Sequence, residues 1–227
     1  MTQRLAGKRV LLTQVDRFMG PDVNELFAAE GATIIGDSGA LASTEEANRL
    51  AEATGPVDVL IANLAESNRP SPIGEISDED WFSLFDALVH PLMRVMRAVL
   101  PGMIERGRGK VVVLGSAAPL RGAPGYGAYC TARGAQLSLV RAVGLEVARH
   151  NVQVNAIAQN FVENPTYYPP EMLADTAQVE RMKKMIPARR FAKGVETAEL
   201  ALFLASESSD FISGQVIPLA GGWVTTM

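Results

Sequence analysis

The sequence predicts a doubly wound α/β fold, a parallel sheet with helices on both faces, in a single domain spanning residues 1–227. Two observations lead to this prediction. Short apolar runs alternate with helical patterns along the whole length, which is typical of βαβ units. The chain is also long enough for one large core, since a domain of this size buries roughly 70–75% of the surface of its unfolded chain. We find no linker, repeat or low-complexity segment that would divide it.

Six β-rich runs are predicted as strands: Arg9–Thr13, Thr33–Gly36, Val57–Ala62, Lys110–Gly115, Gln153–Ala158 and Gln215–Leu219. Six segments between them are predicted as helices: Asp22–Glu30, Thr44–Ala53, Asp78–Arg106, Tyr126–Arg149, Val179–Met185 and Glu196–Ala205. The third helix contains Pro91, which lacks a backbone N–H and clashes with the preceding turn. We therefore expect that helix to kink or to form from two pieces at Pro91.

Composition limits the partners and the compartment. The net charge is −4 without a Lys/Arg run, so we expect neither nucleic acid nor an anionic membrane as a partner. The single cysteine, Cys130, excludes an internal disulfide and fits a reducing compartment. Residues 1–8 carry no apolar signal core, and no run of eighteen uninterrupted apolar residues occurs. These features predict a soluble, cytoplasmic protein.

The turn after the first predicted strand is where a doubly wound fold normally holds a dinucleotide. Such a turn needs glycines, which let the pyrophosphate approach the backbone and the helix N-terminus. Residues 13–20 read TQVDRFMG, so only Gly20 remains, and Phe18 and Gln14 add side chains. We interpret this as a site without a redox cofactor, and we expect no metal. The alternative is a divergent turn with Phe18 packed inward and NAD still bound outside it.

Asp37 ends the second predicted strand, where an acidic side chain would contact an adenosine ribose. An aspartate after a strand is equally typical of a turn.

Ser116, Tyr129 and Arg133 form the pattern S-x12-Y-x3-R. Ser116 follows a predicted strand at its carboxyl end, where open α/β sheets bind ligands. Tyr129 and Arg133 are four residues apart on a predicted helix and share a face. A guanidinium beside a phenol favours the phenolate, so this set predicts acid/base catalysis. The alternative is a loop serine with a surface Tyr/Arg pair, and Tyr126 is a rival base outside the spacing.

The chain resembles the short-chain dehydrogenase/reductase superfamily over nearly all of its length. The resemblance rests on the strand before Asn63 and on the runs LPGM (100–103), VNA (154–156) and AGG (220–222). The resemblance implies a Rossmann-like fold. In that superfamily the residue four after the tyrosine is a lysine, and here it is Arg133. The glycines of the first loop are also replaced, and the Pro-Gly that borders the nicotinamide is Gln159-Asn160.

These departures are similar to those of the halohydrin dehalogenases (haloalcohol dehalogenases), whose motifs are T-x4-(F/Y)-x-G and S-x12-Y-x3-R. Thr13, Phe18 and Gly20 match the first motif. The resemblance implies that the vacated nicotinamide site is a halide pocket, held by backbone N–H groups and ring edges. By position it would be lined by Phe18, Gln159, Asn160, Phe161 and Val162. Tyr167, Tyr168 and Met172 would line the substrate mouth, and Trp223 either completes it or packs the last strand.

The resemblance further implies a cofactor-independent enzyme that converts vicinal haloalcohols to epoxides and halide, and opens epoxides with small anions in reverse. It implies a homotetramer in which the helices predicted at Asp78–Arg106 and Tyr126–Arg149 face a neighbour. Two alternatives stay open. One is an NAD-dependent alcohol dehydrogenase with an unusual loop, and the other is an inactive member that serves as a scaffold or ligand sensor.

Overall fold

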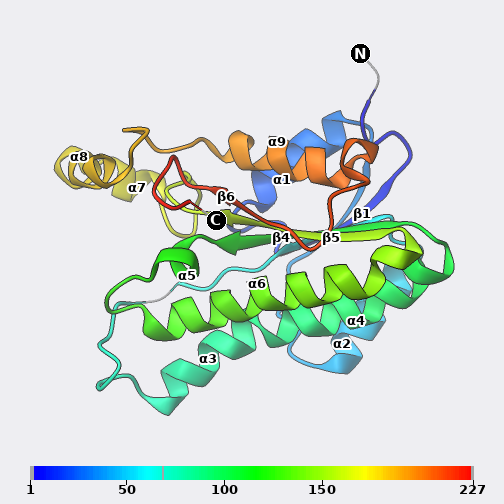
Figure 1. Ribbon diagram of the computed structural model, residues 1–227, viewed down its shortest axis with the longest axis horizontal. Coiled ribbons are helices and arrows are strands. Elements are labelled where there is room, and N and C mark those ends of the chain that lie inside the picture. The colour runs from blue at the N-terminus through cyan, green and yellow to red at the C-terminus, as the bar shows by residue number, and fades with distance from the viewer. Residues whose placement is uncertain (1–2, 68, 226–227) are drawn as a thin grey trace.

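The computed structural model describes residues 3–67 and 69–225, and its strands form one parallel sheet in the order β2-β1-β3-β4-β5-β6 (Figure 1). The strands are β1 (Arg9–Thr13), β2 (Thr33–Asp37), β3 (Val59–Asn63), β4 (Gly109–Ser116), β5 (Val152–Gln159) and β6 (Val216–Leu219). Every strand pair in this sheet is parallel. The predicted fold class is confirmed.

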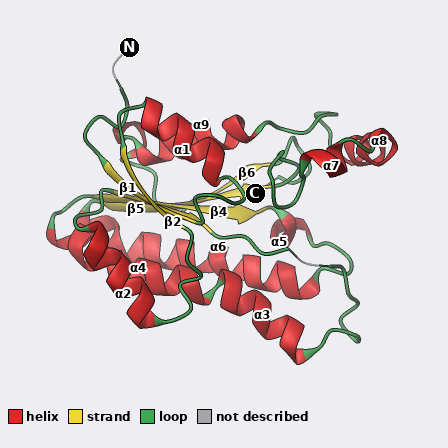
Figure 2. Ribbon diagram, turned by 180° about the vertical axis from the view of Figure 1, so that it is seen from behind, coloured by secondary structure: helices red, strands yellow, loops and turns green. Residues whose placement is uncertain are grey.

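Helices cover both faces of the sheet (Figure 2). One face carries α1 (Gly20–Ala29) and α9 (Gly194–Ala205), which pack against each other. The opposite face carries α2 (Thr44–Thr54), α3 (Asp78–Leu88), α4 (His90–Glu105) and α6 (Gly127–Val147). β3, β4 and β5 are buried along their whole length. The central strands are therefore apolar on both sides, as the continuous apolar runs of the sequence indicate.

The long predicted helix Asp78–Arg106 is built from two pieces, α3 and α4, which meet at Val89. Pro91 occupies the first turn of α4, where its missing N–H leaves no hydrogen bond unmade. By length and composition alone, Asp78–Glu105 is the one helical stretch of the described residues that could cross a membrane. Leu88, Leu92 and Val95 of this stretch are buried in the protein core, as in a core helix.

Two short helices were not predicted: α5 (Ala118–Arg121) and α7 (Pro170–Leu173). Each has four residues, which is too short to show a helical period. The predicted helix Val179–Met185 begins earlier, as α8 (Thr176–Met185), because Asp175 caps it by accepting a hydrogen bond from the Gln178 N–H. The α5, α7 and α8 segments gather at one end of the molecule, beside the C-terminal segment (Figure 1).

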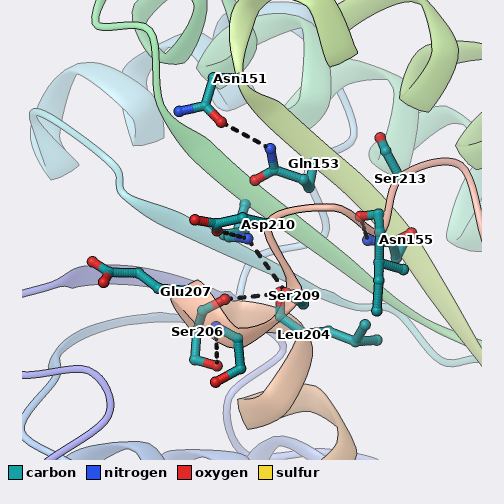
Figure 3. A network of polar contacts seen from close by, with 12 residues as sticks. Asn151, Gln153, Asn155, Leu204, Ser206, Glu207, Ser209, Asp210 and Ser213 are labelled. Carbon is teal, nitrogen blue, oxygen red and sulfur yellow. Dashed lines mark hydrogen bonds and ion pairs between the residues drawn. The ribbon is translucent and has the colours of Figure 1, made fainter.

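Polar side chains close the opposite end of the sheet (Figure 3). Ser209 Oγ donates to the carbonyl oxygens of Leu204 and Ser206 at 2.9 and 3.1 Å. Lys110 Nζ, which is buried, donates to Asp210 Oδ1 at 2.6 Å. This network ties the turn at Glu207–Ser209 to the sheet and leaves the carboxyl ends of the strands free for a site.

Candidate active site

A cavity of about 900 Å³ opens at the carboxyl ends of β4 and β5. Ser116 and Gln159, the last residues of these strands, are register partners. Eleven of the twelve site residues predicted from the sequence line this cavity: Phe18, Ser116, Tyr129, Gln159, Asn160, Phe161, Val162, Tyr167, Tyr168, Met172 and Trp223. The twelfth, Arg133, lies fully buried behind it.

Ser116 is held at the end of β4 by the turn that follows. Its Oγ accepts a hydrogen bond of 3.1 Å from the Ala118 backbone N–H, at the start of α5. The side chain is buried yet lines the cavity. Since the N–H of Ala118 occupies an acceptor site of the hydroxyl, the hydroxyl hydrogen remains to be donated to a ligand oxygen.

Tyr129 and Arg133 meet on one face of α6, as their spacing predicts. Arg133 Nε donates to Tyr129 Oη at 3.2 Å, and the guanidinium carbon lies 5.4 Å from the ring centroid of Tyr129. Tyr129 also lines the cavity, so its oxygen has the guanidinium on one side and ligand space on the other. Tyr126, the rival base, lines the cavity too, with its ring 6.4 Å from that of Tyr129.

Arg133 is fully buried, and oxygen atoms of the surrounding backbone and side chains accept the hydrogen bonds of its guanidinium. Nη1 donates to Leu64 O at 2.9 Å and to Gln136 Oε1 at 2.9 Å. Burial by itself lowers the pKa of the Arg133 guanidinium, but the oxygens of Tyr129 and Tyr167 more than offset this, and the net pKa is raised. A permanent cation therefore stands behind Tyr129. A lysine, with a single ammonium group on a flexible side chain, could not donate hydrogen bonds to all of these acceptors at the same time.

Tyr167 does more than line the substrate mouth. Arg133 Nη2 donates to Tyr167 Oη at 2.9 Å, and Tyr167 Oη donates to Glu66 O at 3.0 Å. Its ring packs edge-on against Phe18 with centroids 5.3 Å apart. Burial raises the pKa of Tyr167 above its usual range, so it remains a phenol. Tyr167 is 34 residues from Arg133, and no local sequence pattern indicates this contact.

The first loop does not fit a pyrophosphate. Its backbone N–H groups are already bonded within the protein: Val15 to Asp37 O, Arg17 to Gln14 O, Phe18 to Thr166 Oγ1, Met19 to Asn63 Oδ1 and Gly20 to Arg17 O. Gln14 Oε1 accepts from the Ala65 N–H at 2.9 Å, so this side chain also fills the loop. Phe18 is the one residue of 13–20 that lines the cavity. A dinucleotide would find no free donor among these five backbone groups.

Phe18 packs inward, which is one half of the alternative interpretation of this loop. It is buried at a positive φ of 51°, and the Arg133 guanidinium carbon lies 5.7 Å from its ring centroid. The second half of that interpretation is that NAD binds outside the loop. It does not fit the five backbone N–H groups, because they are already bonded within the protein. Asp37, the residue proposed for a ribose, accepts from the Gly39 N–H at 3.1 Å and so closes a turn.

The loop after β5 lines the same cavity as Tyr129, and it corrects one expectation. Asn160 Oδ1 accepts from Phe161 N at 2.9 Å and from Tyr168 Oη at 3.0 Å, while Asn160 N donates to Leu219 O. The backbone N–H groups of Asn160, Phe161 and Phe18 are thus engaged and are not free to hold an anion. Gln159 is different, because its buried Oε1 has no hydrogen-bond partner.

Trp223 is found to complete the cavity. Its ring packs edge-on against Phe161, with centroids 5.7 Å apart. Arg121, at the end of α5, stacks on the Trp223 ring, and its guanidinium carbon lies 4.8 Å from the ring centroid. Met172, from α7, lines the outer part of the same cavity.

The family model of enoyl-(acyl carrier protein) reductases matches residues 3–224. A 3-oxoacyl-(acyl-carrier-protein) reductase of Thermotoga maritima is 30% identical over 97% of this chain and 99% of its own. L-xylulose reductase of Bos taurus is 28% identical, with all of both chains covered.

Two solved structures share the fold over nearly their whole length. A dehalogenation enzyme is 31% identical with a TM-score of 0.92, covering 97% of this chain and 100% of its own. A gluconate 5-dehydrogenase of Burkholderia cenocepacia, in complex with NADP and tartrate, is 26% identical with a TM-score of 0.90, covering 100% and 98%. With the matching sheet and the family match along the chain, this protein belongs to the short-chain dehydrogenase/reductase superfamily.

Proposed function

We propose that this protein is a cofactor-independent halohydrin dehalogenase, which converts vicinal haloalcohols to epoxides and halide. The observation that carries the proposal is the pairing of a buried, permanently charged Arg133 with Tyr129 at a cavity whose neighbouring loop has five of its backbone N–H groups already bonded within the protein. The similarity to a dehalogenation enzyme supports it, at 31% identity over nearly the whole chain.

The ring closure needs a base, an orienting donor and an exit for the anion. Tyr129, whose oxygen accepts a hydrogen bond from Arg133 Nε, takes the proton from the substrate hydroxyl. Ser116 donates a hydrogen bond to the same oxygen. The substrate oxygen then attacks the neighbouring carbon from behind, the new C–O bond closes the epoxide, and the halide leaves with the electron pair of the broken bond. Because the attack is intramolecular, the enzyme mainly orients and deprotonates.

In reverse, the phenol of Tyr129 donates its proton to the epoxide oxygen while azide, cyanide, nitrite or halide attacks carbon. The leaving or incoming anion would lie between Phe18 and the loop at Gln159–Val162, all of which line the cavity. Ring edges carry partial positive charge and suit a weakly hydrated anion. The Gln159 amide would donate to the anion through its N–H2 group, since the amide oxygen only accepts.

Halide release from 1,3-dichloro-2-propanol, with no nucleotide present, tests the proposal. We expect the purified protein to release chloride and acid, with epoxide as the product. NAD or NADP should leave the rate unchanged. Tight binding of NADH in a fluorescence titration, together with alcohol-dependent reduction of NAD, would establish the dehydrogenase alternative instead. That alternative is favoured by the reductases and dehydrogenases among the relatives.

We also propose that the enzyme is a cytoplasmic homotetramer. Large apolar side chains are exposed on the helices named in the sequence prediction: Phe82 on α3 is 59% exposed and Leu145 on α6 is 77% exposed. Burying such side chains against a second copy would remove apolar surface from water. Light scattering behind a sizing column measures the assembly, and a monomer at micromolar concentration would refute it.

A further inference from the structure

The cavity is larger than a three-carbon haloalcohol requires. Its volume of about 900 Å³ lies near the upper end of the range of about 300–1,000 Å³ for ligand pockets. Besides Ser116 and Tyr129, the cavity is lined by the apolar side chains of Met172, Met182 and Trp223. The proposed reaction at Ser116 and Tyr129 gives these three side chains no chemical role.

Both charged side chains that line the described cavity are cationic, namely Arg121 and Lys184. The protein as a whole has a net charge of −4. Among the described residues, no ion pair involves either of them. The lining of the cavity therefore carries positive charge, and Arg121 has no carboxylate bonded to it within the part of the chain that the structure describes.

Arg121 is held in place without being neutralised. Its guanidinium carbon lies 4.8 Å from the Trp223 ring centroid, and Nη1 donates to Trp223 O at 3.3 Å. The indole covers one side of the cation, and the carbonyl uses one of its five donors. The remaining donors form a planar fork of the kind that binds a carboxylate through two hydrogen bonds. Such a contact loses less side-chain entropy when the arginine is already packed.

Ser116 ends β4, and Arg121 lies five residues later as the last residue of α5. Five residues of fully extended chain span at most about 18 Å, and the helical turn of α5 shortens this distance. A ligand with its hydroxyl at Ser116 and a short carbon chain along the apolar lining would place its far end near this cation.

We infer that Arg121 binds the carboxylate of an acidic substrate, so that the preferred substrates are haloalcohols whose carbon chain ends in a carboxylate. This inference rests on the proposed function and names its substrate class. Lys184 also lines the cavity and adds to its positive charge. The halide and the carboxylate would bind to different residues, since the proposed halide wall is Phe18 and Gln159–Val162 and Arg121 contacts Trp223.

The test compares kcat/KM for an acid with that for its primary amide, which has the same shape and no charge. The pairs are 4-chloro-3-hydroxybutanoate and 6-chloro-5-hydroxyhexanoate, each with its amide, so that two chain lengths are covered. In the native protein we expect the acid to exceed the amide by about five- to tenfold for at least one pair. In Arg121→Gln that ratio should fall to about one. Arg141→Gln, an exposed arginine on α6 that does not line the cavity, should keep the ratio of the native protein.

Calorimetry with the unhalogenated analogues 3-hydroxybutanoate and 5-hydroxyhexanoate, and their amides, measures the anion site without turnover. Tighter binding of an acid than of its amide, lost in Arg121→Gln, supports the inference even if no halide is released, in which case the proposed function fails alone. Halide release from both members of each pair at equal kcat/KM overturns the inference and leaves the dehalogenase intact. An acid preference that persists in Arg121→Gln also overturns it.

Discussion

Arg133 Nη2 donates a 2.9 Å hydrogen bond to Tyr167 Oη, so one buried guanidinium contacts two tyrosines, Tyr167 and Tyr129. Their environments differ. Tyr167 uses its hydroxyl hydrogen to bond Glu66 O, and burial raises its pKa. Tyr129 faces the cavity, with Arg133 Nε as the donor to its oxygen. Burial therefore keeps Tyr167 a phenol, although the Arg133 cation acts to lower its pKa, and in the proposed reaction Tyr129 is the tyrosine that exchanges a proton with the substrate.

Tyr129→Phe should remove nearly all dehalogenation. The change deletes the cavity hydroxyl that accepts a hydrogen bond from Arg133 Nε, and general acid–base groups supply about 10²–10⁴-fold in rate. Steady-state halide release measures kcat, and circular dichroism checks the fold. Tyr126→Phe is the control, since it removes a cavity hydroxyl of the same type without a contact to Arg133. A larger loss in Tyr126→Phe than in Tyr129→Phe would mean that the base has been wrongly assigned.

Arg133→Met should move the ascending limb of the pH–rate profile to higher pH. The variant removes the cation whose Nε lies 3.2 Å from the oxygen proposed to take the substrate proton, so we expect proton removal to need a more alkaline solution and activity to return partly there. The pH–rate profile of Arg133→Lys should lie between those of the native protein and Arg133→Met, because lysine keeps the positive charge and loses the planar arrangement of donors. An unchanged pH–rate profile in a folded Arg133→Met variant would mean that Arg133 has only a structural role in α6.

The same substitution should lower the free energy of unfolding. Arg133→Met leaves Leu64 O and Gln136 Oε1 without the donor that now satisfies them, and an unsatisfied buried polar group costs about 1–3 kcal/mol. Urea unfolding at neutral pH measures this loss. The pH profile must therefore be recorded where the variant is folded, which the unfolding curve identifies.

The sequence predicts most of the sheet and its helices because their signals are local. The alternation of apolar runs identifies all six strands, and Pro91 identifies the break between α3 and α4. The S-x12-Y-x3-R spacing also indicates the Tyr129–Arg133 contact, because residues four apart share a helix face. These features depend on neighbours in the chain.

The remaining parts of the site depend on tertiary contacts. Tyr167 reaches Arg133 from a loop 34 residues away, and its neighbour Glu66 comes from a different strand end. The expectation that backbone N–H groups hold the halide is wrong for Phe18 and Phe161, because Thr166 and Asn160 use those donors. A sequence pattern does not indicate which backbone N–H groups of a folded loop are already hydrogen-bonded.

Bromide should inhibit the forward reaction competitively, as a product that occupies the wall at Phe18 and Gln159–Val162. Phe18→Ala removes a ring that packs against Tyr167 and lies under the Arg133 guanidinium, so the inhibition constant for bromide should rise. Phe18→Tyr keeps the ring and should change this constant less. A crystal soaked in bromide provides the direct check, and an anion found away from these residues would refute the pocket.

Gln159→Met should stabilise the protein while weakening bromide inhibition. Gln159 Oε1 is buried without a partner, so replacing the amide with a thioether of similar shape removes a desolvation cost of about 1 kcal/mol. In a domain of this size that corresponds to a rise in Tm of roughly 2–4 °C.

Gln136→Met is a matched control, because Gln136 is equally buried but bonds Arg133 through Oε1 and Leu88 O through Nε2. That variant should lose about 1–3 kcal/mol. Calorimetric unfolding of both variants gives the two signs, and a stability loss in Gln159→Met as large as that in Gln136→Met would show that Gln159 Oε1 is satisfied in the free protein.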